Sequence, residues 1–114
     1  MVARRGEIWW TDFGQPFRSE PGYRRPALVV QADPFNQSTI RTVLLIPLTK
    51  TLELASAPGN VLCRPRDSGL PKASVVNVSQ LTVADRRRLV EKAGTVPGRL
   101  MKQVEDGMRL ILGL

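Results

Sequence analysis

The pattern of hydrophobic and polar positions predicts a chain built mainly from short strands. Strict alternation of apolar and polar residues indicates a strand, as does a short apolar run between turn residues. Within residues 42–48 the run from Val43 to Leu48 is continuously apolar, which is typical of a strand buried on both faces. The predicted strands are residues 7–13, 27–32 and 42–48, a short strand ending at Cys63, and residues 74–81.

Glycine, proline and small polar residues separate these strands. Residues 14–22 are predicted as a loop, and turns are predicted at residues 57–59 and 67–71. Residues 82–85 resemble a helix start, although only one or two turns of helix fit before Gly94, and Thr95–Val96 is predicted as a short strand.

The last part of the chain changes from strand to helix periodicity. Apolar residues recur at intervals of three or four after Pro97, a residue suited to a first helical turn. Gly107 weakens this helix by about 1 kcal/mol relative to alanine, so packing must hold it in place. The apolar positions are Leu100, Met101, Val104, Met108, Ile111 and Leu112.

Closely spaced short strands with a terminal helix predict a mainly β fold of the α+β class, a small and strongly curved β-barrel with appended helices. The chain of 114 residues is long enough for a single domain, residues 1–114, with its own core. Adjacent Trp9 and Trp10 should face opposite sides of their strand. We expect one in the core and the other at a dimer surface or stacked on a base.

Charge and composition narrow the class of partner. The formal net charge is +7, which favours an anionic partner such as a nucleic acid. Histidine is absent, so the usual acid–base residue near neutral pH and histidine-ligated metals are excluded. The single cysteine, Cys63, is predicted as a buried thiol. No signal peptide or membrane-spanning run is visible, so a cytoplasmic protein without membrane contact is expected.

One loop combines arginine with conformational restriction. Residues 19–26 read Ser-Glu-Pro-Gly-Tyr-Arg-Arg-Pro and lead into an apolar run. Because proline restricts the residue before it, the backbone of Arg25 is expected to be fixed where loop becomes strand, where a guanidinium can meet a phosphate in a defined place. Ordinary solvated surface is the alternative interpretation. The run Arg86-Arg87-Arg88 poses the same choice, between a phosphate contact and a solvated helix face.

Four segments together carry a family resemblance. They are residues 5–9 (Arg-Gly-Glu-Ile-Trp), residues 20–26, residues 47–49 (Pro-Leu-Thr) and residues 74–80 (Ser-Val-Val-Asn-Val-Ser-Gln). Their order and spacing resemble the MazF/PemK family of toxin endoribonucleases over nearly the whole chain. The resemblance implies an SH3-like barrel acting as a homodimer, inhibited by a cognate MazE-like antitoxin. It also implies cleavage of single-stranded mRNA without a metal or other cofactor, by attack of the RNA 2′-hydroxyl on its own phosphodiester.

The resemblance also assigns roles to individual residues. Arg25 matches the family's catalytic arginine and Thr49 its catalytic threonine. Glu20 matches an acidic position that orients Arg25 or assists deprotonation of the 2′-hydroxyl, with a simple loop salt bridge to Arg24 as the alternative. The residues that we expect to bind RNA are Arg24, Lys50, Ser74 and Gln80.

Two observations leave the functional interpretation open. Ser79 stands where several relatives carry a carboxylate, so the base preference at that position is not implied. The CcdB gyrase poisons share the expected fold without ribonuclease chemistry, and a non-cleaving RNA binder would keep the same basic groove. The pair Arg25 and Thr49 favours cleavage, because a gyrase poison has no need of it.

Overall fold

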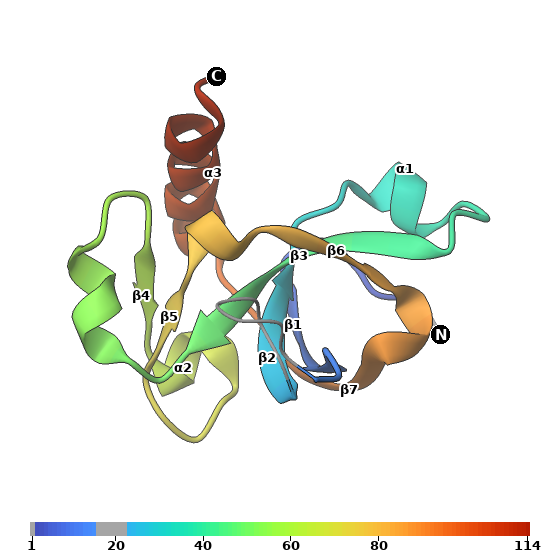
Figure 1. Cartoon of the computed structure of the whole chain (residues 1–114), viewed down its shortest axis with the longest axis horizontal. Coiled ribbons are helices and arrows are strands. Elements are labelled where there is room, and N and C mark those ends of the chain that lie inside the picture. The colour runs from blue at the N-terminus through green and yellow to red at the C-terminus, as the bar shows by residue number, and fades with distance from the viewer. Residues whose placement is uncertain (1, 16–22) are drawn as a thin grey trace.

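A single curved sheet is the framework of the protein, and the computed structural model describes it in residues 2–15 and 23–114. Within these residues the sheet order is β4-β5-β3-β2-β1-β7, and β6 pairs with β3. Figure 1 shows how strongly the strands twist around one another. The strands are β1 (Glu7–Asp12), β2 (Arg24–Val29), β3 (Thr42–Thr49), β4 (Val61–Cys63), β5 (Ser74–Val76), β6 (Thr82–Asp85) and β7 (Leu89–Thr95).

Short helices join the strands and one longer helix ends the chain. The helix predicted after Pro97 is confirmed as α3 (Gly98–Leu112), which buries Leu100 and Val104. None of the helices in the described part of the chain is long and apolar enough to cross a membrane. The mainly β fold with a curved sheet and added helices is therefore as predicted. The remaining helical elements are α1 (Asp33–Asn36), α2 (Pro65–Ser68), η1 (Leu52–Ser56), η2 (Val78–Gln80) and η3 (Arg86–Arg88).

Gly107 lies where α3 crosses the turn before β4. A Cβ atom at Gly107 would lie 2.2 Å from the carbonyl oxygen of Gly59, which is far inside van der Waals contact. Gly59 itself has a positive φ of 87°, a conformation that other residues rarely adopt. The two backbones approach this closely only because both residues are glycine, and this contact accounts for the glycine inside the helix.

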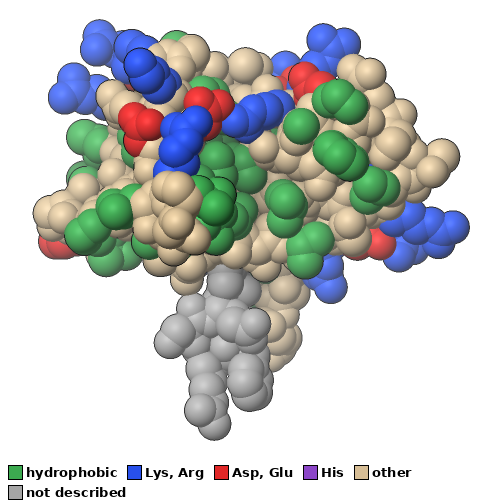
Figure 2. Space-filling view, turned by 90° about the horizontal axis from the view of Figure 1, so that it is seen from above, with side chains coloured by type: hydrophobic (Ala, Val, Ile, Leu, Met, Phe, Trp, Pro, Cys, Tyr) green, Lys and Arg blue, Asp and Glu red, His purple; other side chains and the backbone are tan. Residues whose placement is uncertain are grey.

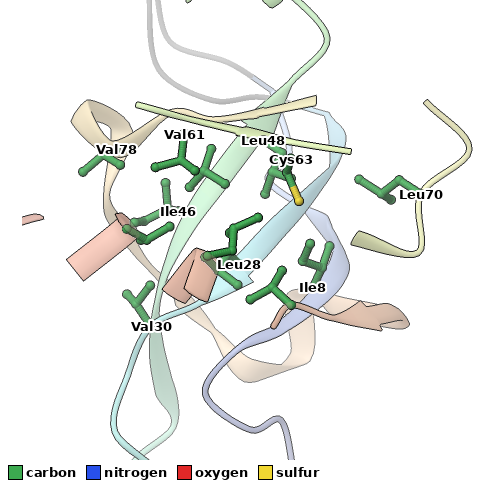
Figure 3. Packing of buried hydrophobic residues seen from close by; sticks show 13 residues of the cluster. Ile8, Leu28, Val30, Ile46, Leu48, Val61, Cys63, Leu70 and Val78 are labelled. Carbon is green, nitrogen blue, oxygen red and sulfur yellow. The ribbon is translucent and has the colours of Figure 1, made fainter. Parts of the chain in front are cut away.

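The sheet buries apolar residues on both of its faces. Ile8, Leu28, Ile46 and Leu48 belong to one core cluster, which α3 covers with Leu100 and Val104 (Figure 3). Trp9 belongs to a second cluster on the other side of the strands, with residues such as Val29, Leu45 and Leu89. As predicted, the adjacent tryptophans separate: Trp9 is buried, and Trp10 is half-buried on the opposite side.

The prediction of a buried thiol at Cys63 is confirmed. Cys63 is fully buried in the first core cluster, at the end of β4. Burial, together with the nearby charge of Asp67, raises the pKa of the Cys63 thiol to about 11. The thiol is therefore protonated at neutral pH and shielded from reagents.

Two strands differ from their predicted extent or burial. β2 begins at Arg24 instead of residue 27, because Arg24, Arg25 and Pro26 already pair with β1. The expectation that residues 42–48 are buried on both faces holds only from Leu45 onward. Leu44 is 43% exposed, and its pairing partner Val83 on β6 is also exposed, because this face of the β3–β6 pair is open to solvent.

The prediction of a helix start at residues 82–85 is wrong. These residues form β6, which pairs in register with Thr42–Leu45 of β3. Strand pairing overrides the local helix signal here, and Thr82 and Val83 are β-branched residues that favour a strand. Asp85 instead caps the following element, since its carboxylate accepts the Arg87 N–H at the start of η3.

Three further boundaries moved for identifiable reasons. The predicted strand 74–81 ends at Val76, because the following residues form η2 and no longer pair with a neighbouring strand. The Val78 N–H, for example, donates to the side chain of Asn60. The predicted two-residue strand at Thr95 is the end of β7, whose Glu, Lys, Ala and Gly residues give little strand signal. The turn predicted at residues 67–71 contains Gly69, which has a left-handed conformation. The first two residues of this predicted turn belong to the short helix α2.

Candidate functional site

A groove opens where the pairing of β2 and β3 ends. The two strands are paired from Val29 to Ala27, which lies opposite Pro47. The next residue of β2 is Pro26, which has no N–H to donate to a neighbouring strand. If the register continued by two more residues, Arg25 would lie opposite Thr49. The start of β2 and the end of β3 therefore meet on the two sides of one opening.

The opposite edge of β3 brings a third strand to the same place. Thr49 pairs with Val75 of β5, whose first residue is the buried Ser74. The resulting groove has a volume of about 410 Å³. Its described lining residues are Trp10, Arg24, Arg25, Pro26, Leu48, Thr49, Lys50, Thr51, Leu70, Pro71, Lys72 and Ser74.

Most of the residues predicted to act together do lie together. Arg24, Arg25, Thr49, Lys50 and Ser74 all line this groove, although they come from three strands and the segments beside them. Arg25 is half-buried at the start of β2, so the expectation of a fixed backbone at the loop–strand boundary is confirmed.

Two predicted site residues are not placed in the groove. Gln80 lies at the end of η2 and is half-buried, but it is not among the residues that line the groove. Glu20 lies outside the described residues, as does most of the predicted loop 14–22.

The charged residues in the described part of the groove lining are all positive. Arg24, Arg25, Lys50 and Lys72 line it, and no carboxylate is among the lining residues that the structure describes. Arg24 is held from outside the groove by Glu91 of β7, 3.5 Å away, and its guanidinium lies 5.8 Å from the centre of the Trp10 ring. Such a concentration of cations beside a concave surface attracts anions.

Some cations elsewhere on the surface have carboxylate partners, whereas others, such as Arg41 and Arg64, have none among the described residues. On the face seen in Figure 2, acidic side chains lie beside basic ones at several places. Examples among the described residues are the pairs Arg87–Asp85, Arg99–Asp67 and Arg109–Asp106. Within residues 2–15 and 23–114, Arg25, Lys50 and Lys72 have no ion pair of this kind.

Hydroxyl groups complete the polar lining of the groove. Thr49 is half-buried, and its Oγ1 accepts the backbone N–H of Thr51 at 3.2 Å. Ser74 is 4% exposed, and its Oγ donates to the carbonyl oxygen of Lys72 at 3.4 Å. A guanidinium and a hydroxyl on opposite sides of a groove are suited to binding the oxygens of a phosphate group.

Sequence reasoning missed Lys72 as a groove residue and left Trp10 undecided. Lys72 is two residues before Ser74, and this short distance was the available signal. Alternation predicted that Trp9 and Trp10 face opposite sides of the strand. It could not predict a groove beside Trp10, because the groove depends on how β2, β3 and β5 meet. The described part of the chain contains no group of three or more His, Cys, Asp or Glu residues that could hold a metal ion, at this site or elsewhere.

Comparison with known proteins extends over the whole chain. Residues 4–112 match the family described as PemK-like, MazF-like toxin of type II toxin-antitoxin system. The chain is 42% identical over its full length to the full length of endoribonuclease MazF6 of Mycobacterium tuberculosis. It is 27% identical to endoribonuclease EndoA of Bacillus subtilis, covering all of this chain and 97% of that protein.

A solved structure has the same fold. The crystal structure of MazF from Deinococcus radiodurans superimposes with a TM-score of 0.84 at 25% sequence identity, covering 100% of this chain and 99% of that one. The similarity therefore includes the strands that form the groove as well as the terminal helix.

Proposed function

Because this chain belongs to the PemK-like, MazF-like toxin family of type II toxin-antitoxin systems, we propose that its groove cleaves single-stranded mRNA at specific sequences. The protein is an endoribonuclease toxin of a toxin-antitoxin pair. The proposal adds the chemistry: cleavage without a metal ion, using the 2′-hydroxyl of the RNA as the nucleophile. Its site of action is the cytoplasm, where the mRNA is.

The proposed reaction is an internal transfer of the phosphodiester. The 2′-oxygen attacks the neighbouring phosphorus, the bond from phosphorus to the 5′-oxygen breaks, and the products carry a 2′,3′-cyclic phosphate and a 5′-hydroxyl. The proton of the 2′-hydroxyl goes to a base and the leaving 5′-oxygen receives a proton. No step requires a histidine or a metal-activated water, in agreement with a chain that contains no histidine.

Arg25 and Thr49 have complementary roles in this proposal. The Arg25 guanidinium stabilises the extra negative charge of the pentacoordinate phosphate; arginine is a poor acid, so its role is electrostatic. The Thr49 hydroxyl donates a hydrogen bond to a non-bridging oxygen. Glu20 orients Arg25 or accepts the proton of the 2′-hydroxyl.

The remaining groove residues bind the strand of RNA on either side of the cleaved bond. Arg24, Lys50 and Lys72 contact phosphates, and Ser74 donates its hydroxyl to a phosphate oxygen. Gln80, beyond the groove, reads a base edge next to it.

Two protein partners follow from the family. A crystal structure of a MazE–MazF complex is known from Deinococcus radiodurans. We infer a MazE-like antitoxin for this chain as well, with an acidic segment that covers the cationic groove. The toxin itself is proposed to act as a homodimer.

The observation that carries the proposal is the meeting of Arg25 and Thr49 in a groove lined by four cations and, within its described lining, no carboxylate. A CcdB-like gyrase poison has the same kind of fold but no use for this pair, so nothing in the groove favours that alternative.

The test is cleavage of a long single-stranded RNA in EDTA by the native protein and by Arg25→Ala, with mapping of the new ends. We expect discrete cuts with 5′-hydroxyl and 2′,3′-cyclic phosphate ends, absent with Arg25→Ala. Arg64→Ala is the matched control, because Arg64 is exposed and does not line the groove. Loss of cleavage in EDTA by folded protein would contradict the metal-independent mechanism. Intact RNA under all conditions would favour the gyrase poison.

A further inference from the structure

The hydroxyl of Thr49 is oriented by the backbone two residues further along the chain. The N–H of Thr51 donates to Thr49 Oγ1 at 3.2 Å. A hydroxyl has one hydrogen to donate and two lone pairs that accept. Because one lone pair is taken by the Thr51 amide, the hydroxyl hydrogen is directed to another acceptor.

The segment that carries this amide is itself held by hydrogen bonds. The carbonyl oxygen of Thr51 accepts Leu54 N–H at 3.1 Å, which begins the turn η1. In the middle of that turn, the carbonyl oxygen of Leu54 accepts a hydrogen bond from Asn60 Nδ2 at 3.0 Å. Asn60 thus holds the turn that follows the groove residue Thr51.

The same asparagine connects this segment back to β3. Its Oδ1 accepts Val78 N–H at 2.9 Å, and its Nδ2 also donates to Asn77 Oδ1 at 3.1 Å. The N–H of Asn77 donates in turn to the carbonyl oxygen of Pro47, 3.1 Å away on β3. Hydrogen bonds therefore lead from Thr49 through η1 and Asn60 and return to β3 two residues before Thr49.

We propose that Thr51 is a positioning residue of the endoribonuclease: its backbone N–H holds Thr49 Oγ1 so that the hydroxyl hydrogen is presented to a non-bridging oxygen of the cleaved phosphate. Asn60 keeps the Thr51 amide in place through η1. This inference rests on the catalytic role proposed above for Thr49. Its physical basis is pre-organisation, since a donor already oriented needs no rearrangement when charge develops on the phosphate.

The conformation of Thr51 allows a direct test by proline. Its φ of −74° is within the range of proline, so Thr51→Pro fits the backbone at this residue while replacing the N–H by a ring carbon. Thr51→Ala is the matched comparison, because it removes the same side chain and keeps the N–H. Steady-state cleavage of one defined RNA gives kcat and KM for each variant, and thermal unfolding reports whether both are folded.

We expect Thr51→Pro to have a kcat about tenfold below that of Thr51→Ala, with KM values within about twofold. The same pair is then compared in a Thr49→Ala background, where no hydroxyl remains to be oriented. There the two variants should differ by less than about twofold, whereas general distortion by proline would lower the activity in both backgrounds.

Each other outcome has a defined meaning. Equal kcat values for Thr51→Pro and Thr51→Ala, with cleavage still lost in Thr49→Ala, would overturn the positioning role alone. Full cleavage by Thr49→Ala would contradict the proposed function of Thr49. If Thr51→Pro does not fold, a backbone ester at residue 51 replaces it, because the ester changes only the N–H to oxygen. This variant is compared with the native amide, and an unchanged kcat would overturn the inference.

Discussion

Two groups of basic residues in this small protein are made of similar side chains but are placed very differently. Arg86, Arg87 and Arg88 form the turn η3, and each side chain donates to another part of the protein. Arg86 Nη2 donates to the carbonyl oxygen of Phe35 at 2.8 Å, and Arg88 Nη1 to that of Asp12 at 3.0 Å. Arg87 is paired with the Asp85 carboxylate at 3.0 Å. Arg86 and Arg88 therefore connect η3 to distant segments of the fold, whereas Arg87 forms a local ion pair.

In the groove the corresponding groups face a concave surface. Arg25, Lys50 and Lys72 line the same groove as Thr49, and within the described residues none of them has a carboxylate partner. Like charges gathered without a counter-charge repel one another, so this arrangement is stabilised when an anion binds. The contrast indicates that hydrogen-bond partners, more than local basic sequence, separate a ligand-binding arginine from a structural one.

The largest expected effect is that of Thr49→Ala, a substitution in the groove. Removing a hydrogen-bond donor to the developing charge should lower single-turnover cleavage by roughly a hundredfold or more. Thr42→Ala is the matched control, since Thr42 is exposed at the other end of β3. Gel-resolved time courses measure both rates. Nearly native cleavage by folded Thr49→Ala would remove Thr49 from the mechanism.

RNA affinity should distinguish the lysines of the groove from the arginines of η3. The double variant Lys50→Ala, Lys72→Ala removes two proposed phosphate contacts. The slope of log affinity against log salt concentration should therefore become shallower by about 0.7 for each lysine. Fluorescence anisotropy with an uncleavable 2′-O-methyl RNA measures the slope. An unchanged slope in the double variant, or an equal change in Arg87→Ala, would contradict the proposed difference.

The free energy of unfolding, unlike RNA affinity, should depend on the arginines of η3. Arg86→Ala removes the bonds from Arg86 Nη2 to the carbonyl oxygens of Phe35 and Ser38. We expect the free energy of unfolding to fall by about 1 kcal/mol, as for the loss of a typical hydrogen bond, while cleavage is retained. Urea denaturation of Arg86→Ala and of the exposed Arg64→Ala gives the comparison. Native stability together with lost cleavage would place Arg86 in the RNA site.

The smallest expected effect concerns acid stability at η3. Hydrogen bonds from Arg87 lower the pKa of the Asp85 carboxyl from 3.8 to about 2. A lowered folded-state pKa stabilises the fold above pH 3.8, and this contribution is lost as the pH falls toward 2. Asp85→Asn should therefore lose less stability than the native protein between these pH values, by a small amount that salt reduces because the pair is exposed. Acid unfolding followed by circular dichroism measures this difference, and parallel curves would contradict it.

The elements with strong periodicity could be predicted from the sequence. β1 follows from apolar alternation, β3 from a continuous apolar run and the long helix α3 from its 3.6-residue repeat. β6 could not be predicted, because residues 82–85 resemble a helix start and only pairing with β3 makes them a strand. β7 was missed because its residues Glu91 to Gly94 have little strand preference without β1 beside them.

The candidate site was predictable where short motifs carry it. Arg25 and Thr49 were found through the family resemblance, and the groove brings them together with Ser74. Lys72 was missed because it lies outside every motif, and only its closeness to Ser74 in the sequence points to the groove. The different roles of the two arginine runs also needed the structure, since the partners of Arg86 and Arg88 are distant in sequence.

The most direct test of the difference between the two groups is the single-turnover rate of RNA cleavage in EDTA by Arg25→Ala and Arg87→Ala. Each variant loses one positive charge, so general attraction to RNA is reduced equally. We predict that Arg25→Ala cleaves roughly a hundredfold or more slowly, whereas Arg87→Ala stays within about twofold of the native rate. Equal rates for the two variants would contradict the conclusion that the groove, and not the basic surface as a whole, cleaves the RNA.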